Sequence, residues 1–468
     1  MHIDFVGAAQ TVTGSKHVIR AKHASVLLDC GMFQGRRRES IEHNLHLGFE
    51  PTSLDAVVLS HAHIDHSGAL PLLVKQGYQG PIYTTPATRD LCAVMLEDAA
   101  MIQAADARYI NKAIDRDKAD MDHVEPLYTQ EDVVRVLEQM TAVPYHRAVT
   151  VAPGIRVKFH DAGHVLGSAV VAIDVEDERE DKRVIFTGDL GRRKMPILKD
   201  PEVVDGGADI LITESTYGDR MHEPIGAMED ELADVLARTY QRGGKVIIPS
   251  FALERAQELL YALRALRKDK RMPPMPIYVD SPLAVKITDV FKLHPECYDK
   301  ETRALIQSSD SPFDFADLHY VTDKEDSKAL DSSDEPAVII SASGMCEAGR
   351  VVHHLKANIE DRKNTICIVG FQAQHTLGRR IVERRPRVRI FGVERDLRAE
   401  VVVFNGFSAH ADQKDLLDYA EAIKARGRVG QVAMVHGEPR AQNALGALLR
   451  ERGFESVHAP APGTSIQV

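Results

Sequence analysis

The sequence has few cysteines, no long hydrophobic run and no excess of positive charge. Its five cysteines form no CxxC pair and are odd in number, which favours a reducing, cytoplasmic setting. No apolar run approaches the roughly 20 residues that a membrane helix needs, so no membrane partner is expected. The first ten residues, MHIDFVGAAQ, lack the basic and apolar segments of a signal peptide. The formal charge of −11 argues against a surface coated with basic residues for nucleic acid, but it does not exclude a local basic channel.

The sequence also lacks internal repeats and low-complexity linkers, and its two halves differ in pattern. Its 468 residues suffice for two domains, or for one domain with a large insertion. The first half predicts short strands such as Ser25–Leu28, a helix over Thr88–Gln103 and a helix start at Thr129. After Glu214, strands and helices alternate, which predicts βα units on a mostly parallel sheet. Residues 301–336 are polar and are expected to form a surface excursion.

The densest group of potential metal ligands is HAHIDHSG, which follows the apolar run Leu54–Leu59. It places three histidines and one aspartate within six positions. Imidazole and carboxylate are ligands that zinc and similar ions prefer. Packing alone rarely requires such a cluster, and one structural zinc takes fewer ligands from one loop. The loop is therefore interpreted as half of a two-metal site rather than as a solvated polar loop.

Further candidate ligands stand in glycine-flanked loops after predicted strands. His164 lies in DAGHVLGSAV, Asp189 in VIFTGDLG and His436 in VAMVHGEP, and Asp29 ends the run Val26–Leu28. Strand ends present side chains rigidly, and glycines let the backbone turn tightly beside them. A lone aspartate there is more often a turn residue, so the prediction depends on the joint occurrence of these residues. The histidines outside this context are expected to be solvated or satisfied in the core: His2, His17, His23, His43, His46, His123 and His146.

The order of HxHxDH, a later loop histidine and TGD resembles the metallo-β-lactamase superfamily. In that superfamily the fold is an αββα sandwich with the metals at one edge. Three later motifs, TESTYGDR, GFSAHAD and VHGE, resemble the signatures of its β-CASP nucleases, which include ribonuclease J. The resemblance covers essentially the whole chain. It implies an α/β protein with a metallo-β-lactamase domain at residues 1–215 and 399–468 and an inserted β-CASP domain at residues 216–398.

The same resemblance implies a ligand set and catalytic roles. It assigns His61, His63 and His164 to one zinc ion, Asp65, His66 and His436 to a second, and Asp189 to both. Asp29 would orient ligands through hydrogen bonds, and Asp65 would also orient the attacking water. His410 would face the scissile phosphate, held by Glu214, because a carboxylate helps a histidine to stay protonated and donate. A capping or buried histidine near Ser408 is the alternative interpretation of His410.

Two predicted strand-to-helix turns, IPSFALERAQ and SASGMCEAGR, resemble family segments that face RNA. Backbone N–H groups in these turns are suited to bind phosphates. The candidate phosphate contacts are Ser250, Arg255, Ser343 and Gly344. The alternative interpretation of each turn is a plain turn with an N-cap. The run from Arg379 to Arg389 carries six arginines and is either a solvated face or a path for RNA. His375 stands where relatives commonly carry glycine. It is interpreted either as an extra phosphate contact or as a tolerated surface change.

These motifs together predict a zinc-dependent ribonuclease that cleaves single-stranded RNA. Two zinc ions would activate the attacking water, and cleavage would be endonucleolytic, with 5′-exonucleolytic cleavage as a further mode. The alternatives are a DNA-directed metallo-nuclease, a non-nucleolytic metal-dependent hydrolase and a silent scaffold. The scaffold is disfavoured because every ligand position is retained. The natural RNA, the physiological metal and the oligomeric state stay open, with a homodimer among the alternatives.

Overall fold

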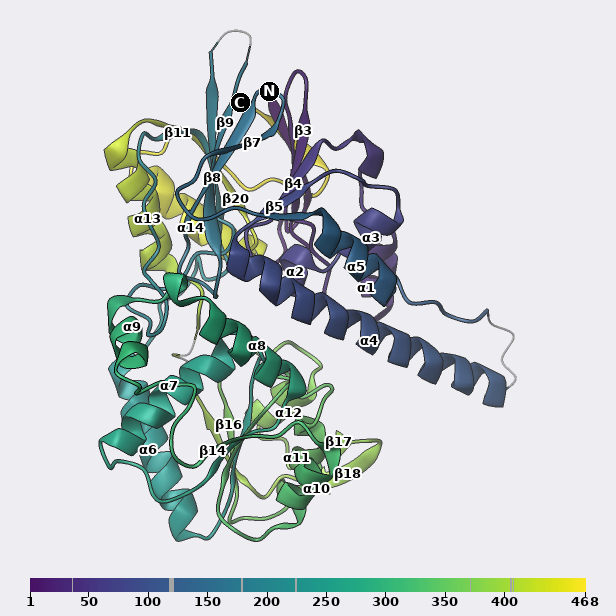
Figure 1. Ribbon diagram of the computed structural model, residues 1–468, viewed down its shortest axis with the longest axis vertical. Coiled ribbons are helices and arrows are strands. Elements are labelled where there is room, and N and C mark those ends of the chain that lie inside the picture. The colour runs from purple at the N-terminus through teal and green to yellow at the C-terminus, as the bar shows by residue number, and fades with distance from the viewer. Residues whose placement is uncertain are drawn as a thin grey trace. The chain divides into compact units, whose positions relative to one another are not determined.

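The chain forms two compact units, shown as ribbons in Figure 1. The computed structural model describes residues 1–35, 37–117, 122–177, 180–223, 225–370, 372–404, 406 and 408–468. Unit 1 comprises Met1–Arg193, Asp200–Met221 and His410–Val468. Unit 2 comprises Lys194–Lys199 and His222–Ala409. Unit 1 is therefore assembled from segments on both sides of a long inserted stretch.

Within the described residues, unit 1 contains two seven-stranded sheets. In spatial order, the first sheet consists of β22 (Thr464–Gln467), β1 (His2–Gly7), β2 (Lys16–Arg20), β3 (Ser25–Leu28), β4 (Ala56–Val58), β5 (Ile82–Thr84) and β6 (Met140–Ala142). The second consists of β21 (Val457–His458), β20 (Val429–Val435), β11 (Ala208–Glu214), β10 (Lys182–Phe186), β9 (Ala169–Val175), β8 (Ile155–Asp161) and β7 (Val149–Ala152). The strand predicted at Ser25–Leu28 is confirmed.

The two sheets pack face to face around one apolar core. Phe5 and Val26 of the first sheet and Phe159 and Phe186 of the second belong to the same buried cluster. Burial alternates along β8, because successive side chains of a strand point to opposite faces of the sheet. A second cluster joins the outer face of the second sheet to the helices α13 (Gln413–Arg426) and α14 (Pro439–Glu451). The outer face of the second sheet is thus buried from β9 to β21, whereas β8 keeps exposed and half-buried side chains on that face.

Helices on the outer side of the first sheet complete the sandwich (Figure 1). They are α1 (Arg37–Leu45), α2 (Ile64–Ser67), α3 (Leu70–Lys75), α4 (Pro86–Asp117) and α5 (Gln130–Gln139). The helix start predicted at Thr129 is confirmed, because its side chain accepts a hydrogen bond from the Asp132 backbone in a reciprocal capping box. The arrangement is the αββα sandwich that the sequence predicts.

Unit 2 is built on a six-stranded sheet among its described residues, and its neighbouring strands pair in parallel. The strands, in spatial order, are β14 (Leu318–Tyr320), β13 (Ile277–Val279), β15 (Val338–Ser341), β12 (Val246–Pro249), β16 (Thr365–Ile368) and β19 (Glu400–Val403). The inner strands are short runs such as VIIP and VIIS that are buried throughout, as expected for a parallel sheet covered on both faces. The predicted parallel sheet is confirmed.

The helices of unit 2 are α6 (Ile225–Gln241), α7 (Arg255–Lys268), α8 (Pro282–Leu293), α9 (Lys300–Gln307), α10 (Lys324–Ser332), α11 (Val351–Asn358) and α12 (Leu377–Val382). A hairpin of β17 (Arg387–Ile390) and β18 (Val393–Asp396) follows α12. Residues 301–336 are more ordered than the sequence suggested, because they include β14 and α10. Asp323 caps α10 by accepting a hydrogen bond of 2.6 Å from the Glu325 backbone.

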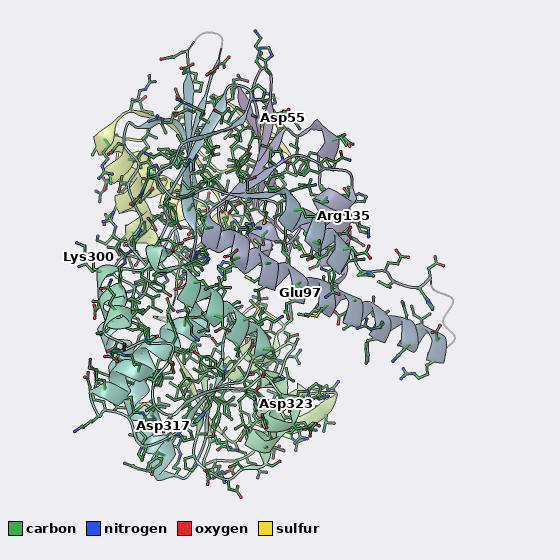
Figure 2. All side chains as sticks on the ribbon, viewed as in Figure 1. Asp55, Glu97, Arg135, Lys300, Asp317 and Asp323 are labelled. Atoms are coloured by element: carbon green, nitrogen blue, oxygen red, sulfur yellow. The ribbon has the colours of Figure 1, made fainter. Side chains whose placement is uncertain are left out.

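Charged side chains lie on the surface of each unit (Figure 2). Asp55 and Arg135 are exposed in unit 1, and Asp317 and Asp323 are exposed in unit 2. In the part of the chain that the structure describes, no helix combines the length and apolar character needed to cross a membrane.

Candidate metal centre

The candidate site lies in unit 1 where strands of both sheets end. Asp29 follows β3 and the HAHIDHSG loop follows β4, and these strands are parallel. Asp189 follows β10, Glu214 ends β11 and His436 follows β20, and these three strands are also parallel. His164 follows β8. The sequence thus brings all the predicted ligands to the carboxyl ends of rigid strands, where loops can present side chains together.

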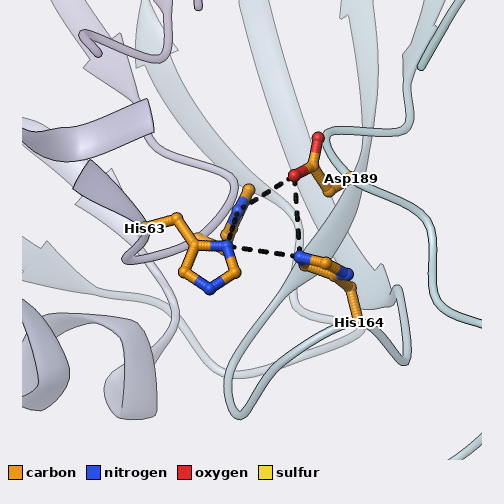
Figure 3. A group of neighbouring side chains, drawn as sticks. His63, His164 and Asp189 are labelled. Carbon is orange, nitrogen blue, oxygen red and sulfur yellow. Dashed lines mark hydrogen bonds and ion pairs between the residues drawn. The ribbon is translucent and has the colours of Figure 1, made fainter. Parts of the chain in front are cut away.

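One group of ligand atoms converges from His61, His63, His164 and Asp189 (Figure 3). His63 Nδ1 lies 3.1 Å from His61 Nε2 and 3.3 Å from His164 Nε2. Asp189 Oδ2 lies 3.5 Å from His61 Nε2 and 3.6 Å from His164 Nε2. Zinc–nitrogen bonds of 2.0–2.1 Å in a tetrahedron place neighbouring ligand atoms about 3.3–3.4 Å apart. The four side chains therefore fit a tetrahedral divalent ion.

A second group consists of Asp65, His66 and His436, together with the other oxygen of Asp189. His436 Nε2 lies 3.4 Å from Asp65 Oδ2. Asp189 Oδ1 lies 3.3 Å from His66 Nε2 and 3.4 Å from His436 Nδ1. Each oxygen of Asp189 thus faces a different group of ligands. Asp189 is thus the residue that links the two groups.

Two buried atoms of the second group support a bound cation. His66 Nε2 and Asp189 Oδ1 have no hydrogen-bond partner among the described residues, although both are buried. Buried polar atoms without partners are rare in native proteins and call for an explanation such as an ion. A cation bound by both atoms would satisfy them, so the side chains present here fit the metal that the ligand pattern implies.

Asp29 fixes the ring of His66. It is fully buried, and its Oδ2 accepts a hydrogen bond of 2.7 Å from His66 Nδ1. Its Oδ1 accepts one of 2.8 Å from the Ser60 backbone. Because Nδ1 is engaged, Nε2 is the nitrogen that faces Asp189. Asp29 itself has a φ of 57°, in the left-handed region that costs most residues about 1 kcal/mol or more.

Four of the buried groups, His61, His63, Asp65 and Asp189, have protonation states suited to binding a metal. Burial lowers the pKa of His61 well below its usual value and that of His63 to about 4, so both rings are neutral. Burial acts to raise the pKa of Asp65 and Asp189, but the surrounding histidines outweigh it and lower both, so both are ionised. Metals bind neutral imidazole and ionised carboxylate, so no deprotonation needs to precede binding at these four residues. His66 differs, because burial acts to lower its pKa but Asp189 and Asp29 outweigh burial and raise that pKa well above its usual value, so this ring gives up a proton when a metal binds.

His410 lies beside the metal ligands and is held by Glu214. His410 Nδ1 is 3.2 Å from Glu214 Oε1, and the Leu190 backbone donates to the same oxygen at 2.6 Å. Glu214 is fully buried, whereas the His410 side chain is 22% exposed. Burial acts to lower the pKa of His410, but Glu214 outweighs it and raises that pKa to about 9. A protonated imidazole therefore lies next to His164, with ring centroids 4.5 Å apart.

Sequence reasoning missed three hydroxyl groups that support the ligands. Ser60 Oγ donates to Asp29 Oδ2 at 3.0 Å and lies 3.0 Å from His61 Nδ1. Thr216 Oγ1 lies 3.1 Å from His436 Nδ1 and donates to the His436 carbonyl. Ser168 Oγ accepts a hydrogen bond of 3.1 Å from the His164 backbone. Ser60 directly precedes HAHIDHSG and Thr216 lies in TESTYGDR, so position beside a motif was the available signal.

The four candidate phosphate contacts lie in unit 2. Ser250, Ser343 and Gly344 lie in loops that follow β12 and β15, and Arg255 begins α7. The Ser250 backbone donates to the Ser341 carbonyl at 3.0 Å, so the loops adjoin. Ser343 Oγ donates to the Ala348 carbonyl at 3.3 Å, and Gly344 is buried. Arg255 is buried and pairs with Glu258, which engages its guanidinium. The turn after β15 does not lead directly into a helix, because α11 begins at Val351. Their phosphate role stays a prediction.

The arginine run and His375 also have structural explanations. Arg379 and Arg385 pair with Glu383, Arg387 pairs with Asp396, and Arg389 pairs with Glu394. Arg380 and Arg384 donate to backbone carbonyls. Four of the six arginines thus share three carboxylates, so the run keeps a net positive charge, and both interpretations of it stay predictions. His375 has a φ of 72°, in the region where glycine is preferred, which gives a backbone reason for glycine at this position.

An αββα sandwich that gathers two sets of histidine and aspartate ligands at its strand ends is the fold of a metal-dependent hydrolase. Three family models match the chain in order: the metallo-beta-lactamase superfamily over residues 14–234, the Beta-Casp domain over 256–381 and the Zn-dependent metallo-hydrolase RNA specificity domain over 394–460. The chain belongs to the metallo-β-lactamase superfamily, among the members that carry a Beta-Casp domain. The predicted family and fold class are confirmed.

Similar proteins include a bacterial enzyme and archaeal factors. The chain is 40% identical over 455 residues to Ribonuclease TTHA0252 of Thermus thermophilus, covering 97% of each chain. It is 31% identical over 452 residues to Transcription termination factor FttA of Methanosarcina mazei, covering 94% of this chain and 67% of that one. A crystal structure of a protein of unknown function from Enterococcus faecalis shares the fold, with a TM-score of 0.53, 14% identity and coverage of 100% and 99%.

Proposed function

We propose that the chain is a zinc-dependent ribonuclease that hydrolyses phosphodiester bonds of single-stranded RNA. The observation that carries the proposal is Asp189, whose two oxygens face separate groups of ligand atoms. The matched RNA specificity domain and the similarity to a ribonuclease support RNA as the substrate. We assign hydrolysis to a metallo-β-lactamase domain at residues 1–215 and 399–468, with a β-CASP domain at residues 216–398.

The proposal includes two zinc ions. His61, His63 and His164 would hold one, Asp65, His66 and His436 the other, and Asp189 both. When bound, such ions supply Lewis acidity for an attacking water and neutralise charge on a phosphate. Among the chain's own groups, Asp29 orients His66, and Asp65 would accept a hydrogen bond from the water.

His410 and Glu214 would act on the phosphate side of the reaction. Glu214 holds His410 Nδ1, so the ring is fixed and stays protonated. We propose that His410 donates a hydrogen bond to the scissile phosphate or a proton to the leaving oxygen. General acid catalysis of this kind typically contributes about 10²–10⁴-fold to the rate.

The test is cleavage of 5′-labelled single-stranded RNA and of DNA with the same sequence by the zinc-loaded protein. We expect RNA to be cleaved, and we expect His63→Ala to lose this activity while circular dichroism shows a folded protein. Internal fragments indicate endonucleolytic cleavage, and a ladder of mononucleotides indicates 5′-exonucleolytic cleavage. Robust cleavage of DNA alone would replace the proposal with a DNA-directed nuclease. Wild-type activity in His63→Ala would exclude the assigned metal centre.

Metal identity, assembly and location are parts of the proposal with their own tests. Metal analysis of the protein purified without added metal would show whether zinc or manganese is bound. A homodimer is tested by light scattering of the purified chain. A cytoplasmic location is tested by fractionating cells that express it.

A further inference from the structure

A second cluster of metal-binding side chains lies in unit 1, outside the candidate metal centre. It consists of His146, His160 and Glu202, each of which offers one ligand atom within 4.8 Å of the other two. Glu202 Oε2 lies 2.6 Å from His146 Nε2 and 3.4 Å from His160 Nδ1. Both imidazoles therefore face the same carboxylate oxygen. The sequence placed His146 among the solvated histidines because no strand end or ligand motif surrounds it.

The backbone of β8 holds this cluster together. His160 lies on β8, and the carbonyls on either side of it bind the other two members. The His146 backbone donates to the Phe159 carbonyl at 2.9 Å, and the Glu202 backbone donates to the Asp161 carbonyl at 2.8 Å. Three segments that are far apart in the sequence thus present their side chains at one point of a strand. The position is fixed by main-chain hydrogen bonds rather than by the side chains themselves.

The backbone at His146 is also unusual. Its φ is 65°, in the left-handed region that side chains other than glycine, asparagine and aspartate seldom adopt. Such a conformation costs about 1–3 kcal/mol and tends to be kept where the side chain is used. Its ring centroid lies 5.6 Å from that of His160. This geometry keeps both rings next to the Glu202 carboxylate.

We propose that His146, His160 and Glu202 form a second metal site, for zinc or a related borderline divalent ion. Two imidazoles and one carboxylate are ligands typical of such ions and not of magnesium or calcium. The His146 side chain is 49% exposed and the Glu202 side chain 36% exposed, so water can complete the coordination. Ion pairs from Glu202 to both His146 and His160 are the alternative, and the zinc count below separates it from a metal site.

The site lies close to the loop that carries His164, a ligand of the candidate metal centre. His164 follows His160 by four residues along the same segment. Tyr145, next to His146, donates from its hydroxyl to the Ser168 carbonyl at 2.9 Å, and Ser168 in turn holds the His164 backbone. Binding at the second site would therefore tie β8 and this loop to residues 145–146 and 202, and would stabilise unit 1.

The test counts bound zinc after equilibrium dialysis of the full chain at saturating Zn²⁺. We expect wild type to hold one ion more per chain than His160→Gln or Glu202→Gln. Each substitution removes a ligand and should lower the affinity for this ion by more than about 100-fold, beyond the loss typical when a residue that only supports a ligand is changed. His123→Gln is the matched control, because His123 is exposed and pairs with Asp115 at 2.9 Å without a second imidazole. Circular dichroism checks that each variant is folded.

A variant with the opposite effect sharpens the experiment. Lys158 lies two residues before His160 and on the same face of β8, so its charge opposes a cation there. We expect Lys158→Gln to tighten zinc binding by about two- to fivefold, as screened repulsion at this range allows. Equal zinc counts in wild type, His160→Gln and Glu202→Gln would overturn the proposal and leave an ion pair only. Because the readout is a difference in bound zinc, it does not depend on the substrate proposed above.

Discussion

We propose that Asp29 acts on metal binding through its hydrogen bond with His66. It is fully buried and contacts His66 at 2.7 Å, so its negative charge makes that imidazole a stronger ligand. Asp29→Asn keeps the shape of the side chain and removes the charge. We expect the affinity for zinc to fall by about 10–100-fold, measured by competition with a coloured chelator. Ser15→Ala, which loses only a hydrogen bond of 3.3 Å to Asp29, is the control and should change the affinity less. Equal affinity in Asp29→Asn and wild type would contradict this role.

Glu214 offers a ligand atom within 4.8 Å of those of Asp189 and His436, and we propose that it serves the chemistry rather than metal binding. Its Oε1 holds His410, and the charge of Glu214 maintains the raised pKa of that ring. In Glu214→Gln the ring loses this charge, so kcat for RNA cleavage should fall by about 100-fold or more. The measurement is single-turnover cleavage together with the zinc count, which should stay at the wild-type value. A loss of zinc equal to the loss of activity would instead place Glu214 among the ligands.

The same residue scale explains which parts of the site were predictable. HAHIDHSG concentrates four potential ligands in one loop, so its spacing predicts a metal site, whereas the assignment of each ligand to an ion came from the resemblance to the metallo-β-lactamase superfamily. Ser60, Thr216 and Ser168 could not be predicted, because hydroxyl groups are common and most serve turns or caps. Their role depends on which atom of a histidine the hydroxyl group contacts. That contact forms only when both sheets have folded.

At the level of elements, the site depends on how closely two loops approach. A Cβ atom on Gly31, after β3, would lie 1.6 Å from the Asp65 carbonyl oxygen. The obstructing atom is backbone, so Gly31→Ala must displace the HAHIDHSG loop. We expect its zinc affinity to drop by more than about tenfold, measured by the same chelator competition. Gly370→Ala is the control, because its Cβ would meet only Phe251, at an ordinary 3.7 Å. Unchanged affinity in Gly31→Ala would show that the loop tolerates the shift.

Elements with strong local signals could be predicted, and those held by distant partners could not. The run Ser25–Leu28 and the cap at Thr129 carry their own signals, an apolar strand and a capping box. The edge strand β14 has only three residues, and one of them, His319, is exposed. It forms because the Ile277–Val279 strand offers an unpaired edge to it. Sequence reasoning therefore missed it.

At the scale of the whole molecule, the change of pattern after Glu214 indicated an inserted unit. It did not indicate that Lys194–Lys199 belongs to unit 2 while its neighbours on both sides belong to unit 1. This segment has no periodic pattern. It joins unit 2 through two backbone hydrogen bonds. The Asp299 N–H donates to the Ile197 carbonyl at 2.9 Å, and the Lys199 N–H donates to the Cys297 carbonyl at 3.2 Å. Such long-range pairings leave no local trace in the sequence.

Unit 2 contains a buried charge network that should make its stability depend on pH. His354 is fully buried and lies 2.7 Å from both Asp280 and Asp331, and Arg350 and Ser327 also contact Asp280. Burial acts to lower the pKa of His354, but the two carboxylates outweigh it and raise that pKa. Burial acts to raise the pKa of Asp280, but His354, Ser327 and Arg350 outweigh it and lower that pKa. The native state thus favours the charged form of both groups.

The direction of the pH dependence follows from these shifts. The contribution of His354 is complete below its unfolded pKa of about 6.5 and is lost as the pH rises through its higher folded pKa. The contribution of Asp280 is complete above its unfolded pKa of about 3.9 and is lost as the pH falls through its lower folded pKa. Unit 2 should therefore be most stable between about pH 4 and pH 6.5 as far as this network is concerned.

His354→Gln tests this network, because glutamine can hydrogen-bond but cannot carry the charge. We expect the unfolding free energy of unit 2 to fall by about 2–3 kcal/mol at pH 5.5 and by less at pH 9, because the wild type has lost part of the contribution there. Calorimetry of the full chain at both pH values measures the transition. The transition of unit 1 is the internal control, since no residue of the network belongs to it. Equal destabilisation at pH 5.5 and pH 9 would show that His354 acts through packing rather than through its charge.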